Sequence, residues 1–287
     1  MSLNQSVLIC DQVNPILKEI LEKNGLKVTY EPEITTEQIA EKIGNFNVVV
    51  VRGRTKLVKE LIEKADNCQI IARVGVGLDN IDEDAAKVKN IRVINAVEGA
   101  ITAVAELVVG LMLSMAREIP RADREIRNGN WIKKEMMGSE LKGKYLGIIG
   151  LGNIGKRLGR LARALNMNII GHDAVPIDEE FSKEVGLMKA DLDTLLASSD
   201  YVSFHVPLLD STKHMINAEK LGLMKKTAYI VNTSRGGVID EEALYNALKD
   251  GNLAGAALDV FEVEPATGNK LTNLPNFVAT PHIGAQT

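Results

Sequence analysis

The chain has 287 residues, of which 45% are hydrophobic and 25% charged, and its formal net charge is −4. This composition is typical of a globular protein and excludes a fibrous or low-complexity chain. The weakly negative balance gives no general attraction to nucleic acid or to an anionic membrane, so an anionic ligand needs a local basic site. The chain is long for one hydrophobic core, and we expect two domains.

The cysteines and the N-terminus indicate the cellular environment. Cys10 and Cys68 lack the spacing of a metal site, and both lie in or beside apolar strand patterns. We therefore expect buried free thiols and no metal. The N-terminus lacks a basic region followed by an apolar core, and no apolar run approaches about 18 residues. These features predict a cytoplasmic protein that does not contact a membrane.

Short apolar runs alternate with helical patterns over the first 98 residues. The predicted strands are residues 6–10, 27–30, 48–51, 70–73 and 92–94. The predicted helices are residues 14–24, 36–43 and 56–64. This alternation predicts a parallel α/β domain of flavodoxin-like topology.

Two loops in this half follow predicted strands directly, where open α/β sheets bind ligands. One has the sequence RGRTK, three cations in five residues, and the other RVGVGLD, whose glycines allow backbone N–H groups to approach an anion. The alternative for each is an ordinary charged or tight surface turn. The candidate anion-binding residues are Arg52, Arg54, Val74, Gly75, Val76 and Gly77.

Residues 100–127 form one long helical pattern that ends at Asn128 and Gly129. Its length and apolar breadth favour a helix that crosses between domains or packs against another subunit. A core helix of the second domain is the alternative. The segment around Trp131 is too irregular to assign.

Residues 145–173 combine the features of a dinucleotide-binding unit. A buried strand, 145–149, runs into Gly150, Gly152 and Gly155 in G-x-G-x-x-G spacing, and a helix and a second strand lead to Asp173. The glycines permit a tight turn, a close approach of the pyrophosphate and close packing of helix on strand. Asp173 can accept hydrogen bonds from the adenosine ribose and would repel a 2′-phosphate, so we expect NAD and not NADP.

Further strands are predicted at residues 201–206, 228–232, 255–258 and 277–279. Parallel strands deliver the residues at their carboxyl ends to one edge of a sheet, the edge that carries the glycine turn. Arg235, Asp259, Glu264 and His282 are therefore expected to converge near the nicotinamide.

This set suits hydride transfer between NAD and a 2-hydroxy acid. Arg235 can bind the carboxylate and polarise the carbonyl oxygen with its planar donors. His282 can exchange a proton, because an imidazole ordinarily titrates near pH 6.5. Glu264 can hydrogen-bond the other imidazole nitrogen, and Asp259 can accept from the nicotinamide carboxamide. The remaining histidines need no catalytic role.

Several blocks resemble those of the NAD-dependent D-2-hydroxyacid dehydrogenases: RVGVGLDNID, GIIGLGNIG, VNTSRGGVID, LDVFEVEP and PHIGAQT. The resemblance implies a substrate-binding domain made of residues 1–98 plus 283–287 and a Rossmann NAD-binding domain made of residues 99–282. It also implies an Arg–Glu–His set at Arg235, Glu264 and His282. It further implies a homodimer joined through the NAD domains, with the long helix involved.

The resemblance and the strand ends together give the candidate ligand contacts. Those for the cofactor are Gly150, Gly152, Asn153, Ile154, Gly155, Asp173, His205, Val206, Pro207, Thr212, Thr233, Ser234, Arg235, Asp259, His282 and Gly284. Arg235 and His282 join the two basic or glycine-rich loops as candidate substrate contacts. The basic loop favours 3-phospho-D-glycerate, whose oxidation is the first step of serine synthesis. The alternatives are a glyoxylate or hydroxypyruvate reductase and a NAD-sensing protein without turnover.

Overall fold

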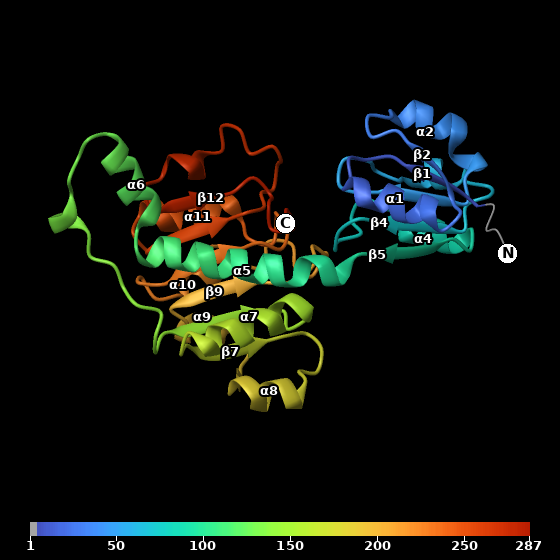
Figure 1. Ribbon diagram of the computed structural model, residues 1–287. Helices are drawn as coiled ribbons and strands as arrows, with labels where there is room; N and C mark the ends of the chain where they lie inside the picture. The colour runs from blue at the N-terminus through green and yellow to red at the C-terminus, as the bar shows by residue number, and fades with distance from the viewer. Residues whose placement is uncertain (1–4) are drawn as a thin grey trace. The chain divides into compact units, whose positions relative to one another are not determined.

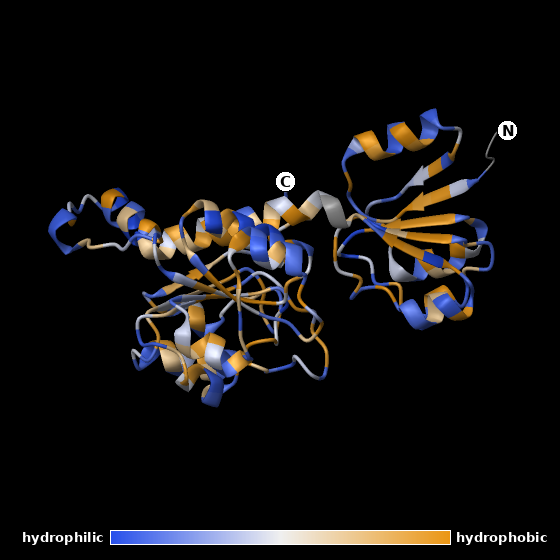
Figure 2. Cartoon of the chain, turned by 90° about the horizontal axis from the view of Figure 1, so that it is seen from below, coloured by the Kyte–Doolittle hydropathy of each residue, from blue (hydrophilic) through white to orange (hydrophobic). Residues whose placement is uncertain are grey.

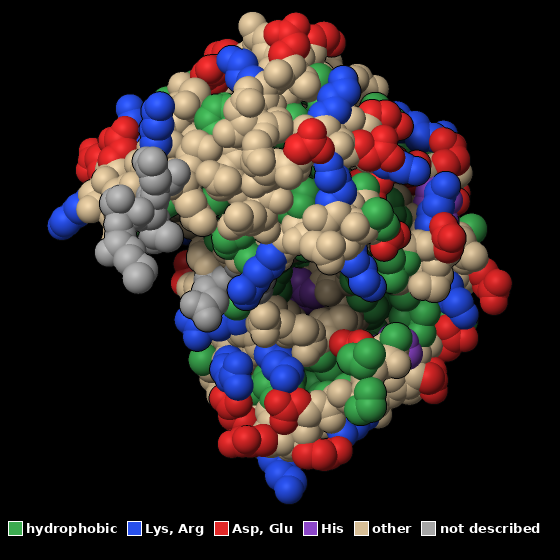
Figure 3. Space-filling view, turned by 90° about the vertical axis from the view of Figure 1, so that its right-hand side faces the viewer, with side chains coloured by type: hydrophobic (Ala, Val, Ile, Leu, Met, Phe, Trp, Pro, Cys, Tyr) green, Lys and Arg blue, Asp and Glu red, His purple; other side chains and the backbone are tan. Residues whose placement is uncertain are grey.

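The structure is a computed structural model that describes residues 5–287, apart from the side chains of residues 97 and 98 (Figure 1). The chain divides into two compact units, Met1–Ala100 and Ile101–Thr287. On the face drawn in Figure 3, acidic and basic side chains are interspersed, in keeping with the small net charge.

The first unit contains a five-stranded parallel sheet in the order β2-β1-β3-β4-β5. Its strands are β1 (Ser6–Ile9), β2 (Lys27–Tyr30), β3 (Val48–Val51), β4 (Ile70–Arg73) and β5 (Arg92–Asn95). Its helices are α1 (Pro15–Lys23), α2 (Thr36–Lys42), η1 (Ile43–Asn45), α3 (Lys59–Ile62) and α4 (Glu83–Val88). This strand order is that of flavodoxin, so the predicted topology is confirmed.

The inner strands β1, β3 and β4 are mostly hydrophobic (Figure 2), because helices cover both faces of a doubly wound sheet, whereas the edge strands β2 and β5 carry polar residues. Both cysteines are buried free thiols, as expected. Burial raises the pKa of Cys10 to about 12 and that of Cys68 to about 11, so neither thiol ionises near neutral pH.

Local capping explains where helices of this unit begin. The Asn14 side chain accepts from the Ile16 N–H, and Thr35 forms a reciprocal capping box with Gln38. The helix predicted over 56–64 is wrong in extent. It shrinks to α3 because Leu57 is drawn into an isolated parallel bridge with Ile81. The six-residue α4 was not predicted, since so short a segment shows no helical period.

The second unit contains a seven-stranded parallel sheet in the order β12-β11-β10-β9-β6-β7-β8. Its strands are β6 (Tyr145–Ile149), β7 (Asn168–His172), β8 (Met188–Lys189), β9 (Tyr201–Phe204), β10 (Tyr229–Asn232), β11 (Gly255–Leu258) and β12 (Phe277–Ala279). Its helices are α5 (Val97–Ala116), which begins in the first unit, α6 (Ile119–Arg127), η2 (Lys133–Glu135), α7 (Asn153–Ala164), α8 (Glu179–Val185), α9 (Leu192–Ser198), α10 (Ala218–Gly222), α11 (Glu241–Lys249) and η3 (Lys270–Asn273).

The strand order of this sheet reverses between β6 and β9, which is the arrangement of the Rossmann fold. The predicted pair of doubly wound α/β domains is thereby confirmed. Open sheets of this kind bind ligands at the reversal, outside the carboxyl ends of the strands. The glycine turn follows β6, so it stands at that point.

The helix predicted to run unbroken over 100–127 is wrong. It divides into α5 and α6 at Glu118, whose φ of 50° is left-handed. Pro120 explains the break: it has no N–H to donate, and its ring would clash with the carbonyl of residue 116 in a continuous helix. It is instead accommodated in the first turn of α6, where Pro is tolerated.

Helix α5 is more apolar than the sequence analysis stated. The 18-residue window Gly99–Ala116 has a mean hydropathy of 1.9, enough by length and composition to cross a membrane. Part of this helix packs into the core of the second unit, where Ala105, Val108 and Met112 are fully buried. Since 44% of that window is buried, packing in the core accounts for part of its apolar character.

Candidate functional site

The glycine turn after β6 has the shape of a phosphate cradle. Gly150 has a φ of +90°, and a Cβ there would lie 2.5 Å from the carbonyl oxygen of His205. A Cβ on Gly155 would lie 2.1 Å from the carbonyl oxygen of Gly150. A Cβ on Gly152 would meet nothing within 4 Å. Two glycines are thus required by close packing, whereas the third leaves open space above the turn.

Helix α7 begins directly after this turn, with Gly152 at its N-cap. The first N–H groups of a helix have no intrahelical partner, and here they include the candidate contacts Asn153 and Ile154. The first turn contains no acidic side chain. Free N–H donors and the positive end of the helix dipole fit a pyrophosphate at this position.

Asp173 follows β7 and lies beside the glycine turn. Its Oδ2 accepts from the Leu151 N–H at 2.6 Å, and its Oδ1 accepts from the Val175 N–H at 3.1 Å. The carboxylate is therefore fixed by backbone donors, with lone pairs left for ribose hydroxyls. The next residues, AVPI, supply no cation for a 2′-phosphate. These features fit NAD.

His205 directly follows β9, and its carbonyl oxygen faces Gly150 of the glycine turn. Its Nε2 lies 3.0 Å from the Ser203 hydroxyl, and burial lowers its pKa to about 4, so the ring is neutral at pH 7. Val206 and Pro207 follow His205 in the same loop. The Thr212 hydroxyl donates to the Pro207 carbonyl at 2.6 Å and accepts from the Leu209 N–H. Thr212 thus shapes this loop, and its contact with a cofactor stays a prediction.

The turn after β10 is organised by Asn232, a residue that the sequence analysis missed. Its buried Oδ1 accepts from the N–H and the hydroxyl of Ser234, and its Nδ2 donates to the Arg235 carbonyl at 2.9 Å. The signal was a polar residue at the carboxyl end of a buried strand. The Thr233 hydroxyl is buried without a hydrogen-bond partner in the described chain, so a bound ligand could satisfy it.

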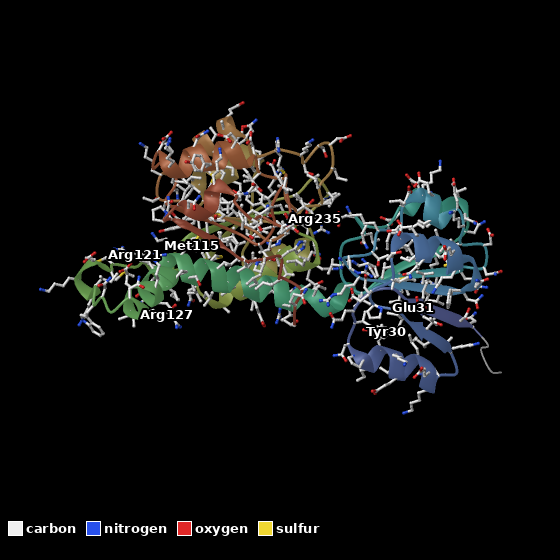
Figure 4. All side chains as sticks on the ribbon, turned by 90° about the horizontal axis from the view of Figure 1, so that it is seen from above. Tyr30, Glu31, Met115, Arg121, Arg127 and Arg235 are labelled. Atoms are coloured by element: carbon white, nitrogen blue, oxygen red, sulfur yellow. The ribbon has the colours of Figure 1, made fainter. Side chains whose placement is uncertain are left out.

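Arg235 extends from this turn (Figure 4), and its Nη1 donates to the Ser234 carbonyl at 2.6 Å. The next residue, Gly236, packs against the loop that carries Glu264. A Cβ on Gly236 would lie 1.9 Å from the carbonyl oxygen of Phe261. Since Glu264 Oε1 accepts from the Phe261 N–H, the Arg235 turn and the Glu264 loop are in direct contact.

His282 and Glu264 form a hydrogen-bonded pair. His282 Nδ1 lies 2.8 Å from Glu264 Oε2, and both side chains remain partly exposed. An ionised Glu264 accepts from Nδ1–H, which assigns the tautomer and leaves Nε2 as a proton acceptor. A cavity of about 630 Å³ adjoins the pair, walled on its other sides mainly by proline, alanine and threonine residues.

Asp259 builds the turn on which His282 stands. Its fully buried carboxylate accepts from the Thr280 hydroxyl at 2.6 Å, the Ile283 N–H at 2.9 Å and the Gly284 N–H at 2.8 Å. Its carbonyl accepts from the His282 N–H, and His282 has a left-handed φ of 54°. These bonds also place residues 283–287 in the second unit, whereas the sequence analysis assigned them to the first.

In the first unit, the two candidate substrate loops follow β3 and β4. The Arg54 guanidinium donates to backbone carbonyls within the unit, and its contact with a substrate stays a prediction. In the second loop the Arg73 side chain packs over Gly75, whose φ is +144°, and Asn95 donates to the Val76 carbonyl at 2.5 Å. The roles of Val74 and Gly77 stay predictions.

Comparison with known proteins agrees with this geometry. Residues 109–284 match the family model described as D-isomer specific 2-hydroxyacid dehydrogenase, NAD binding domain. The chain belongs to the D-2-hydroxyacid dehydrogenase family. NAD is accordingly the cofactor for which the second unit is built.

Relatives in this family carry different names. D-3-phosphoglycerate dehydrogenase of Methanocaldococcus jannaschii is 46% identical over 282 residues, which are 98% of this chain and 53% of that protein. Hydroxypyruvate reductase of Thermotoga maritima is also 46% identical, over 96% of this chain and 90% of that protein. The chain therefore spans about half the length of the first relative and nearly all of the second.

Solved structures of D-2-hydroxyacid dehydrogenases and related reductases share the fold. A glyoxylate reductase from Paecilomyes thermophila superposes with a TM-score of 0.90 at 33% identity, covering 99% of this chain and 90% of that one. An acyclic imino acid reductase in complex with NADPH and D-Arg gives 0.87 at 29% identity, covering 98% and 91%.

Proposed function

We propose that the protein is a NAD-dependent dehydrogenase that oxidises a D-2-hydroxy acid to the 2-oxo acid, with 3-phospho-D-glycerate as its substrate. The observation that carries the reaction is the His282–Glu264 pair, 2.8 Å apart, at the same sheet edge as the glycine turn. This edge combines a proton acceptor, a carboxylate-binding arginine and a dinucleotide cradle.

The proposed mechanism assigns one task to each side chain. Bound NAD supplies the hydride acceptor for C2 of the substrate. Arg235 binds the substrate carboxylate and fixes C2 in place. His282 takes the hydroxyl proton at Nε2 as the carbonyl forms, and Glu264 stabilises the resulting imidazolium through Nδ1. Neutral His205 adds no positive charge to the cradle at pH 7.

The choice of substrate rests on the loop after β3. Arg52 and Lys56 are cations of this loop, and a cation suits a phosphate. The alternative is reduction of hydroxypyruvate or glyoxylate, and it is supported by the relative from Thermotoga maritima.

We also propose a cytoplasmic homodimer joined through the second unit. Helix α6 has no buried residue, and the segment after it exposes large apolar side chains, with Trp131 80% and Met137 88% accessible. Figure 4 labels Arg121 and Arg127, which lie on helix α6. Exposed apolar groups of this size favour burial against a second copy. Light scattering should give twice the chain mass.

The reaction is tested by NADH formation from 3-phospho-D-glycerate, with glyoxylate and hydroxypyruvate assayed in the reverse direction. His282→Ala should lower kcat about 10²- to 10⁴-fold, the usual size of general acid–base catalysis, while NADH binding is retained. Unchanged turnover in this variant would exclude the proton-transfer role. Activity on hydroxypyruvate alone would favour the alternative substrate.

A further inference from the structure

The basic loop after β3 contains a cation that is used internally. Arg54 Nη2 donates to the carbonyls of Cys10 at 2.6 Å and Pro32 at 2.8 Å, and Nη1 donates to the Ile34 carbonyl at 3.1 Å. Its Nε lies 3.3 Å from Asp11 Oδ1. A guanidinium has five N–H donors, so most of its hydrogen-bonding capacity is used by these four acceptors.

These acceptors belong to two different segments of the chain. Cys10 and Asp11 follow β1, and Pro32 and Ile34 follow β2, whose last residue, Tyr30, is labelled in Figure 4. Carbonyls at the carboxyl end of a parallel sheet point outward and need donors. The planar fork of Arg54 supplies them simultaneously, which a lysine ammonium cannot match in geometry.

Asp11 fixes the same loop through hydrogen bonds to Arg52 and Thr55. Its buried carboxylate accepts from the Arg52 N–H at 2.5 Å, the Thr55 N–H at 3.3 Å and the Thr55 hydroxyl at 2.7 Å. Asn80 completes the arrangement by donating to the carbonyls of Arg52 and Thr55. The backbone on both sides of Arg54 is therefore held by the Asp11 and Asn80 side chains, which come from two other segments.

We propose that Arg54 and Asp11 are positioning residues that fix the 52–56 loop, and that Arg54 is not a ligand of the substrate phosphate. The inference deepens the proposed function, because it assigns phosphate selection to other cations of this loop. It also predicts that Arg54 serves phosphorylated and unphosphorylated substrates alike, since both depend on the shape of the loop.

The test compares Arg54→Ala and Arg54→Lys with Lys59→Ala, a matched control that removes an exposed cation from the adjacent helix α3. The KM values for 3-phospho-D-glycerate and hydroxypyruvate should rise by the same factor in Arg54→Ala, about tenfold or more, as misplacement of binding groups does. Arg54→Lys should show the same parallel rise, since it keeps the charge and loses the fork. A rise confined to the phosphorylated substrate and rescued by lysine would overturn the proposal.

A second readout does not depend on activity. In the intact protein, hydrogen exchange at the Arg52 and Thr55 amides should be slow, and Arg54→Ala or Asp11→Asn should accelerate both at least tenfold. Lys59→Ala should leave them slow. Unaltered exchange in both loop variants would refute the proposal that Arg54 and Asp11 fix the 52–56 loop. If the wild-type protein has no dehydrogenase activity, the proposed function is refuted. The exchange measurement then still decides whether Arg54 and Asp11 fix the 52–56 loop.

Discussion

The glycine turn after β6 and the basic loop after β3 stand at equivalent places, the carboxyl end of a central strand in a parallel sheet. They use their polar groups differently. Around Gly152 the space is open and helix N–H groups are left for a ligand. Around Arg54 the guanidinium and the backbone are already paired within the unit. The same sequence signal, small or basic residues at a strand end, thus occurs both at a turn with open space for a ligand and at a loop whose polar groups are paired internally.

The largest effect is expected where the turn is most crowded. Gly150→Ala forces a side chain into a φ of +90° and into the His205 carbonyl, 2.5 Å away. Unfavourable backbone and overpacking together should cost about 3 kcal/mol or more of unfolding free energy. Gly152→Ala should fold normally and weaken NAD binding about tenfold or more, because its methyl group occupies the open space. Urea unfolding and NADH titration measure both effects, and equal stability of the two variants would contradict the assignment.

A smaller loss is expected at the turn that carries His282. Asp259→Asn keeps the shape of the side chain but places an amide where the carboxylate accepts from N–H groups. Losing hydrogen bonds to a buried charge should cost about 2–3 kcal/mol and lower kcat, since His282 loses its support. Thr280→Val removes one donor only and should cost less. A variant with full stability and turnover would show that Asp259 does not shape this turn.

Acid should lower the stability of the folded protein through His205. Desolvation lowers the pKa of the His205 ring to about 4 in the folded protein, below its ordinary 6.5, so only the unfolded chain binds a proton between these values. Stability is therefore full above pH 6.5 and falls as the pH drops toward 4, by at most about 3 kcal/mol. His205→Asn should flatten this dependence in urea unfolding at pH 7 and pH 4.5. An equally steep dependence in the variant would contradict it.

The smallest effect is expected at Gly53, in the basic loop. A Cβ there meets nothing within 4 Å, as at Gly152. Gly53→Ala should therefore change the unfolding free energy by no more than about 0.5 kcal/mol. Thermal denaturation beside Gly152→Ala makes the comparison direct. A large loss of stability would mean that this loop is as tightly packed as the turn at Gly150.

Much of the molecule follows from local sequence. The strands at 27–30, 48–51, 70–73, 145–149, 255–258 and 277–279 have the bounds that were predicted from the sequence. The glycine spacing and Asp173 predicted the turn after β6 as the NAD-binding site, because tight turns and close approaches restrict the residue type at each position, and the Asp173 carboxylate does lie against the Leu151 N–H of that turn. The pairing of Glu264 with His282 was likewise expected from their places after successive strands.

Tertiary contacts decided the rest. The sequence shows Arg54 as one of three cations in a loop, but only folding brings the carbonyls of Cys10 and Pro32 to its guanidinium. The contact of Asp259 with the cofactor stays a prediction, and only folding brings the Ile283 and Gly284 N–H groups to its carboxylate. Backbone preferences and hydrophobic periods are properties of short segments, so the sequence alone determined most of the strands and the glycine turn, while the extent of α3 depended on the distant bridge between Leu57 and Ile81. The partner of a polar side chain depends on which distant segments meet, so the tertiary structure alone determined which polar groups are used internally.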